Sequence, residues 1–261
     1  MMYYLFIALS FAVGLLCGWA MRNAVVHEKK ILSQLKRPGR ILAILYSEKH
    51  AKHVAFDLTV GTILGLCFAQ ISSQVWMYSD LPLALKLVAI KVVGIIVLLL
   101  VYLAVYDLLT MEIPAAVSYL VLAILICANA VLLVVAGTGS ITLWQGNEIW
   151  PLSSFAAGIT GAFLVGVIVV ATKERGMGAG DIFLAAILGL ALGLSKSFVA
   201  FYVTILSATA VGLVVAFRKG TLKNVPIPFV PFIVFGILIT FLFWNLILPF
   251  LQYSAGLSFL R

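Results

Sequence analysis

The feature that most constrains this chain is a series of long apolar segments separated by short polar ones. Eight runs occur, at about 3–21, 55–77, 83–106, 114–137, 151–172, 182–194, 198–217 and 227–250. A helix needs about 20 mainly apolar residues to cross a bilayer, and every run except 182–194 is about that long. The short run would be tilted, extended by its flanks or a partial span. The sequence therefore predicts an all-α polytopic membrane protein with about eight transmembrane helices, as a single membrane domain over 1–261.

The composition excludes most other classes of protein. Hydrophobic residues make up 64% of the chain and charged residues only 10%, whereas a soluble domain is about half apolar and about a quarter charged. A soluble enzyme, a disordered chain and a nucleic-acid-binding domain are therefore excluded as first interpretations. Cys17, Cys67 and Cys127 all lie inside apolar runs, so neither a disulfide scaffold nor a cysteine metal site is expected.

The basic residues predict the orientation of the spans. The net charge is +8, and the segments 22–53, 107–113, 173–181 and 218–224 together hold 13 of the 17 Lys and Arg residues. Basic residues accumulate on the cytoplasmic side of membrane proteins. We therefore expect these four segments in the cytoplasm, with 22–53 as the one larger loop and both termini outside. The partners expected from composition are membrane lipids, with no nucleic acid.

Two aspartates at the ends of apolar runs are the candidate functional groups. Asp107 begins the segment DLLTMEIP, and Pro114 opens the next span. Asp181 follows three alternating glycines, Gly176, Gly178 and Gly180. An ionisable residue costs about 2.5–3.5 kcal/mol at a helix centre and less near the interface, so either aspartate could simply end its helix in water. Both, however, are expected on the same membrane face.

A pair of neighbouring carboxylates has a specific chemistry. Two such groups cannot both ionise cheaply, so one acts as a base that activates water and the other as an acid. This is the chemistry of aspartic proteases, and it needs no metal or cofactor. The glycine-rich turn is not a phosphate-binding loop, because no Lys-Ser/Thr pair follows it.

Three short motifs of the sequence resemble motifs that one protein family carries in the same order along the chain. GMGAGD at 176–181, DLLTMEIP at 107–114 and IPFVPF at 227–232 resemble motifs of the type IV prepilin peptidases, the prepilin leader peptidases among the GxGD membrane aspartic proteases. The resemblance implies that Asp107 and Asp181 are the catalytic pair of a core over 107–250. The residues implied to shape the site are Gly176, Gly178, Gly180, Pro114, Pro228 and Pro231.

The resemblance also implies a location and a substrate. The location is the bacterial cytoplasmic membrane, in a multi-pass arrangement. The substrates are prepilin or pseudopilin precursors that lose a basic leader at the cytoplasmic face. Many members also methylate the new N-terminus with S-adenosylmethionine, a second activity that 22–53 could support and that stays open here.

The chain departs from the family at several positions. Residues 22–53 lack the cysteines that bind zinc in many members, so no metal site is predicted. His50 and His53 supply only two ligands and are expected to be solvated. Phe183, Val230 and Ala115 stand where many members have Lys, Gly and Asn or Asp, which bears on substrate range.

Two other classes of function remain alternatives. A non-catalytic assembly protein would keep the fold without a working aspartate pair. An ion-coupled transporter would use Asp107, Asp181 and the 182–194 run as an ion site. The transporter predicts inverted repeats, and no such repeat is recognised in the sequence.

Overall fold

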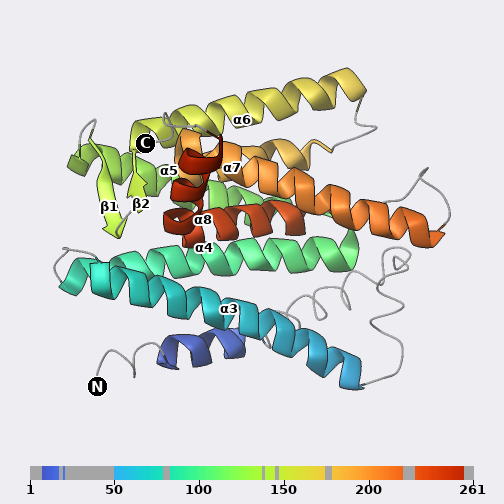
Figure 1. Ribbon diagram of the computed structural model, residues 1–261, viewed down its shortest axis with the longest axis horizontal. Coiled ribbons are helices and arrows are strands. Elements are labelled where there is room, and N and C mark those ends of the chain that lie inside the picture. The colour runs from blue at the N-terminus through green and yellow to red at the C-terminus, as the bar shows by residue number, and fades with distance from the viewer. Residues whose placement is uncertain are drawn as a thin grey trace. The chain divides into compact units, whose positions relative to one another are not determined.

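The computed structural model describes residues 8–17, 20, 50–78, 83–136, 139–144, 147–173, 178–219 and 227–255. These residues form helices and one small β-hairpin (Figure 1). The chain divides into two compact units, Met1–Ile113 and Pro114–Arg261, called unit 1 and unit 2 below. The boundary falls inside the predicted DLLTMEIP segment, so Asp107 belongs to unit 1 and Asp181 to unit 2.

Unit 1 contains a short N-terminal helix, Ala8–Cys17, and two long helices, α3 (His50–Tyr78) and α4 (Leu83–Thr110). Glycines let the N-terminal helix approach α3 closely. A Cβ atom at Gly14 would overlap the backbone of Gly65, and one at Gly61 would lie 3.1 Å from the Leu15 backbone. Such small-residue contacts are typical of helix packing in membranes, where van der Waals contact replaces the hydrophobic effect.

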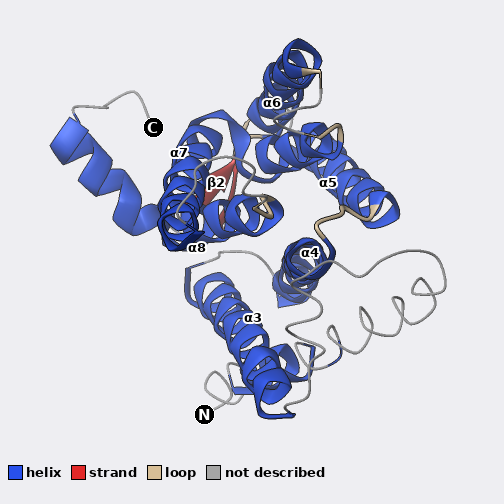
Figure 2. Cartoon of the chain, turned by 90° about the vertical axis from the view of Figure 1, so that its right-hand side faces the viewer, coloured by secondary structure: helices blue, strands red, loops and turns tan. Residues whose placement is uncertain are grey.

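Unit 2 contains the helices α5 (Ala115–Ala136), α6 (Pro151–Thr172), α7 (Gly180–Lys219) and α8 (Val230–Ala255). A hairpin of β1 (Ile141–Trp144) and β2 (Asn147–Ile149) joins α5 to α6, with Ile141 opposite Ile149. Figure 2 shows this hairpin, in red, beside α7 and α8. The sequence analysis predicted no strands, and this small hairpin is an addition to an otherwise all-helical fold.

The prediction of separate helices over 182–194 and 198–217 is confirmed within α7. The backbone is non-helical at Gly193 (φ 74°, ψ 174°), so this element consists of two helices that meet at a kink. A positive φ is strained for residues with a Cβ atom and is readily adopted by glycine. We call the two parts α7a (180–192) and α7b (194–219). In Figure 1 the chain turns back at this break, so the two parts do not form one straight helix.

Contacts within unit 2 establish the directions of its helices. A Cβ atom at Gly161 would contact Ala185, and one at Gly158 would contact Leu190, so α6 and α7a are antiparallel. The hydroxyl of Thr204 in α7b donates a hydrogen bond to the Phe232 carbonyl of α8 at 3.2 Å. The break at Gly193 therefore allows α7a to pack on α6 while α7b packs on α8.

Six helices of the described chain are long and apolar enough to cross a membrane. They contain Leu58–Trp76, Lys86–Thr110, Ala115–Val134, Pro151–Thr172, Gly180–Phe217 and Val230–Phe250. The runs 182–194 and 198–217 are the two parts of α7, and together they lie in the one segment Gly180–Phe217. Of the first predicted run, Ala8–Cys17 is described as a continuous helix. Most of the predicted basic loop, 22–49, lies outside the described residues. The fold is that of a multi-pass membrane protein, and its inside–outside orientation stays a prediction.

Candidate active site

Asp107 lies in the last turn of α4 and is 5% exposed. The predicted span ended at Tyr106, but the helix continues to Thr110, so Asp107 is part of the helix and not the first residue of an elbow. Leu100, Leu103 and Ala104 lie three to seven residues earlier and are also buried. Asp107 therefore continues the buried face of α4, at the helical spacing that places these residues on one side.

The elbow after α4 is short and locally held. Met111 adopts a positive φ of 54° and donates its backbone N–H to the Asp107 carbonyl at 2.7 Å. The Glu112 N–H donates to the Thr110 hydroxyl oxygen at 3.0 Å. Pro114 then precedes α5, and its carbonyl accepts hydrogen bonds from the N–H groups of Val117 and Ser118, both at 3.1 Å. Proline suits this position because it has no N–H group to satisfy.

Asp181 lies in the first turn of α7 and is 8% exposed. Its carboxylate Oδ2 accepts a hydrogen bond from the Gly178 N–H at 3.0 Å, and its own N–H donates to the Gly178 carbonyl at 3.0 Å. This reciprocal pair resembles one half of a capping box, in which an acidic residue reaches back to the start of its helix. The free N–H groups of a helix N-terminus favour a negative charge there.

Gly178, in the turn before Asp181, has open space around it. A Cβ atom built on it would meet no atom within 4 Å, and the residue is exposed. One oxygen of Asp181 is thus held by the turn, while the space over Gly178 stays accessible. Gly180 begins α7. Gly176 lies outside the described residues.

Two helices of unit 2 pack beside the aspartate. On the α6 side, a Cβ atom at Gly166 would lie 3.9 Å from Ile182. On the α5 side, the rings of Tyr119 and Phe183 meet edge to face, with centroids 5.0 Å apart. The Tyr119–Phe183 contact places the first turn of α5 and the first turn of α7a at the same end of unit 2. Pro114 and Asp181 therefore lie at that end as well.

Sequence reasoning did not identify Tyr119 as a neighbour of this turn. Its only signal was a position five residues after Pro114, and nothing in the sequence linked it to Phe183. Tyr119 is 52% exposed, so its ring presents an open aromatic surface near the aspartate.

The prolines of the third motif lie at the start of α8. Pro228 is in the segment that precedes the helix, and Pro231 is its second residue. The Phe229 carbonyl accepts hydrogen bonds from the N–H groups of Phe232 and Ile233, at 3.1 and 3.3 Å. These hydrogen bonds are those of ordinary helix initiation, and the site-shaping role of the two prolines stays a prediction.

Among the described residues, no group of three or more His, Cys, Asp and Glu side chains could hold a metal ion. The side chains of His50 and His53 lie outside the described set. The structure brings Gly178, Asp181, Tyr119 and Phe183 together within unit 2. Asp107 belongs to unit 1, and its pairing with Asp181 stays a prediction.

Comparison with known proteins gives a family match over part of the chain. The model of the type IV leader peptidase family matches residues 94–217, a segment that contains both aspartates, the elbow and the glycine-rich turn. This segment is therefore similar to the type IV leader peptidase family.

The chain is also similar to one curated protein over part of its length. The relative is the prepilin leader peptidase/N-methyltransferase of Bacillus subtilis (strain 168), 33% identical over 103 residues. The match covers 38% of this chain and 42% of the relative. No solved structure matches.

Proposed function

We propose that the chain is a membrane aspartic endopeptidase that cleaves the leader from prepilin or pseudopilin precursors at the cytoplasmic face of the membrane. The observation that carries the proposal is the family match over 94–217, because it includes both candidate aspartates and the turns that hold them. Each aspartate is buried at the end of an apolar helix, where a charge without a role would be costly.

Connectivity supports the pairing of the two aspartates. Pro114 lies at the same end of unit 2 as Asp181, through the Tyr119–Phe183 contact. Asp107 precedes Pro114 by only seven residues. Even a fully extended chain of that length spans about 25 Å at most, and four of these residues are helical.

The proposed reaction uses the two carboxyl groups in different protonation states. The ionised aspartate takes a proton from a water molecule, and the water oxygen bonds to the carbonyl carbon of the scissile peptide. The protonated aspartate donates its proton to the carbonyl oxygen, which gives a tetrahedral diol. A proton then passes to the peptide nitrogen, the C–N bond breaks, and a carboxylic acid and a free amine are released.

The turn at Gly178 orients one of the two carboxylates. The Gly178 N–H donates to Asp181 Oδ2, a charge-assisted hydrogen bond that holds this oxygen in place. We propose that Asp107 and Asp181 share the roles of base and acid, with neither role assigned to one residue. The open space over Gly178 would let the extended backbone of a substrate approach the Asp181 carboxylate.

The substrate would place its apolar helix in the membrane and its basic leader in the cytoplasm. Phe183 lies two residues after Asp181 in the first turn of α7, and its ring contacts that of Tyr119. Their rings would contact the apolar residues that follow the scissile bond. Phe183 replaces a lysine found in many family members, so this chain would favour an uncharged side chain at that contact.

N-methylation of the new N-terminus is a second part of the proposal, carried by the name of the Bacillus subtilis relative. The cofactor would be S-adenosylmethionine. The described residues offer no set of side chains that we assign to that cofactor, so no step is derived through it. The same assay can report this activity.

The test is co-expression of the full chain with a candidate precursor, followed by mass spectrometry of the product N-terminus. We expect Asp107→Asn and Asp181→Asn each to lower the cleavage rate by at least about 10³-fold, since each removes a group used in every turnover. Glu112→Gln and Glu148→Gln are matched controls, because both acids are exposed. Normal cleavage by either Asp variant would contradict the proposed aspartate pair, whereas absence of cleavage by the wild-type chain would favour the assembly or transporter alternatives.

A further inference from the structure

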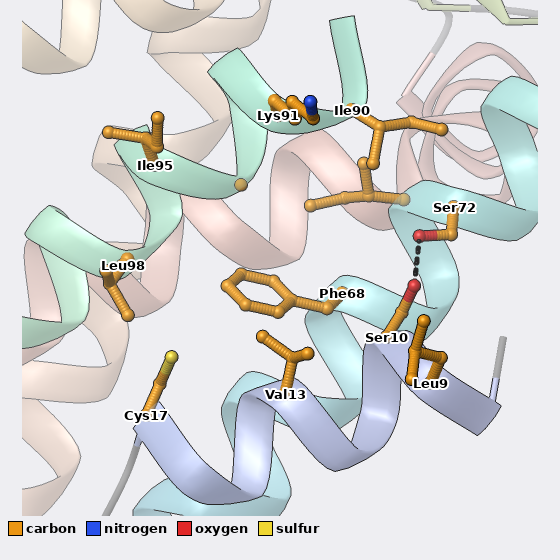
Figure 3. Close-up of a pocket in the computed structure, with 12 residues that line it drawn as sticks. Leu9, Ser10, Val13, Cys17, Phe68, Ser72, Ile90, Lys91, Ile95 and Leu98 are labelled. Atoms are coloured by element: carbon orange, nitrogen blue, oxygen red, sulfur yellow. Dashed lines mark hydrogen bonds between the residues drawn. The ribbon is translucent and has the colours of Figure 1, made fainter. Parts of the chain in front are cut away.

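Unit 1 contains an apolar groove between the N-terminal helix and α4, with α3 as its floor (Figure 3). Its volume is about 410 Å³. Leu9 and Val13 line it from the N-terminal helix, Phe68 from α3, and Ile95 and Leu98 from α4. The groove runs along α4 from the level of Lys91 to that of Leu98, about 10 Å at ~1.5 Å per residue.

The lining of the groove is mainly apolar, so it suits an apolar ligand better than a polar one. The hydroxyls of Ser10 and Ser72 are 2.9 Å apart and hydrogen-bonded to each other. Apolar cavities stay free of water and accept apolar molecules. Leu9 and Ile95 at the rim are 61% and 50% exposed, so the opening is apolar too.

One charged residue, Lys91, is among the residues that line the groove, and it is exposed. It lies five residues after the start of the candidate span Lys86–Thr110, or about 7.5 Å along the helix. A lysine at this depth can extend its ammonium group to the headgroup region. The lining of the groove therefore combines apolar side chains with one ammonium group that is long enough to reach the headgroup region.

We propose that this groove binds one acyl chain of an anionic phospholipid, whose phosphate contacts the Lys91 ammonium. An acyl chain gains little hydrophobic free energy on leaving the bilayer core for the groove. Its affinity would instead come from van der Waals contact with the groove wall and from the charge of Lys91. A basic residue near the membrane surface contributes about 1 kcal/mol toward anionic lipid, which corresponds to about a fivefold preference over a zwitterionic lipid.

The test uses the purified full chain in detergent and native mass spectrometry with phosphatidylglycerol or phosphatidylcholine. The wild-type chain should retain one phosphatidylglycerol, with about fivefold lower occupancy by phosphatidylcholine. Gly94→Leu should abolish this binding by filling the groove, because a Cβ atom at Gly94 meets only Phe68, at 3.8 Å. Val13→Phe fills the groove from the opposite helix and should have the same effect.

Matched variants separate the groove from general effects on the protein. Gly166→Leu adds the same side chain at a glycine of α6 with similar room, 3.9 Å from Ile182, and should keep the lipid. Lys91→Met should bind both lipids equally, whereas Lys91→Arg and Lys86→Met should keep the preference. Absence of bound phosphatidylglycerol in the wild type, or its retention in both groove-filling variants, would overturn the proposal. A preference that survives Lys91→Met would refute the part assigned to Lys91.

Discussion

The break in α7 leads to a quantitative prediction about Asn129 of α5. At the break, the Leu194 N–H donates to the Ser153 hydroxyl at 3.0 Å. In an unbroken helix this N–H would donate to the Leu190 carbonyl. The Leu190 carbonyl instead accepts a hydrogen bond from Asn129 Nδ2 at 3.0 Å, and the same nitrogen donates to Leu125 at 2.9 Å. Asn129→Leu removes this replacement partner while keeping a side chain of similar size.

The expected cost follows from two opposing effects. A buried carbonyl that loses its partner costs about 1–3 kcal/mol, but hydrogen bonds between membrane helices average only about 0.6 kcal/mol in double-mutant cycles. The Asn129 Oδ1 atom has no hydrogen-bond partner in the described structure, and leucine removes that unfavourable group. We therefore expect Asn129→Leu to lower the free energy of unfolding by about 1 kcal/mol.

Reversible unfolding in mixed micelles, with increasing mole fraction of a denaturing detergent, measures this change. Thr160→Val is the matched control, because the Thr160 hydroxyl bonds only to carbonyls of its own helix, at 2.8 and 3.2 Å. It should change the free energy of unfolding by less than about 0.5 kcal/mol. An Asn129→Leu variant as stable as the wild type would show that the Leu190 carbonyl does not depend on Asn129.

Three further variants test other parts of the structure. Gly178→Ala should leave stability unchanged, because a Cβ atom there meets nothing within 4 Å, but should lower kcat/KM for precursor cleavage by about tenfold if the substrate backbone approaches this glycine. Gly189→Leu should destabilise the chain by at least about 3 kcal/mol, because even a Cβ atom there would overlap the Ala157 backbone of α6, and such overpacking cannot relax. Lys196→Met should loosen the hairpin, since the Lys196 ammonium donates to the Glu148 carbonyl at 2.8 Å and lies 5.7 Å from the Trp244 ring.

Each of these three predictions has its own readout and its own contrary result. For Gly178→Ala, steady-state kinetics alongside a thermal melt would show whether activity falls without loss of stability; normal kinetics would remove Gly178 from the substrate path. For Gly189→Leu, detergent-induced unfolding is the measurement, and near-wild-type stability would show that α6 and α7a can separate. For Lys196→Met, hydrogen exchange at β1 and β2 should increase, and unchanged protection would mean that the hairpin is held without this lysine.

Much of the fold could be predicted from the sequence because bilayer thickness sets a length that apolar runs must meet. The runs 83–106, 114–137 and 151–172 correspond closely to α4, α5 and α6. Pro114 and Pro151 mark helix starts, since proline tolerates the first turn and has no N–H group to satisfy. The two aspartates could also be singled out, because ionisable residues at the ends of apolar runs are rare in a chain with only nine acidic residues.

The end of α4 and the neighbours of Asp181 could not be predicted, because they depend on contacts between segments that are far apart in the sequence. Asp107 was expected to begin an elbow, but α4 continues one more turn to Thr110. It stops before Met111, which has a positive φ although it is neither glycine nor proline. The aromatic contact of Tyr119 with Phe183 joins residues 64 positions apart in the chain. Local sequence patterns carry no information on such pairs.

The sequence by itself determined that this is a multi-pass membrane protein and singled out two carboxylates as candidates for chemistry, because both inferences follow from local composition and the cost of charge in hydrocarbon. Only the tertiary structure decided where α7 breaks. Gly189 and Gly193 are both glycines in the same apolar run, yet one packs against Ala157 as part of a helix and the other reverses the chain. The difference arises because Ser153 and Asn129, from α6 and α5, satisfy the backbone groups that the break at Gly193 exposes, as an apolar membrane requires.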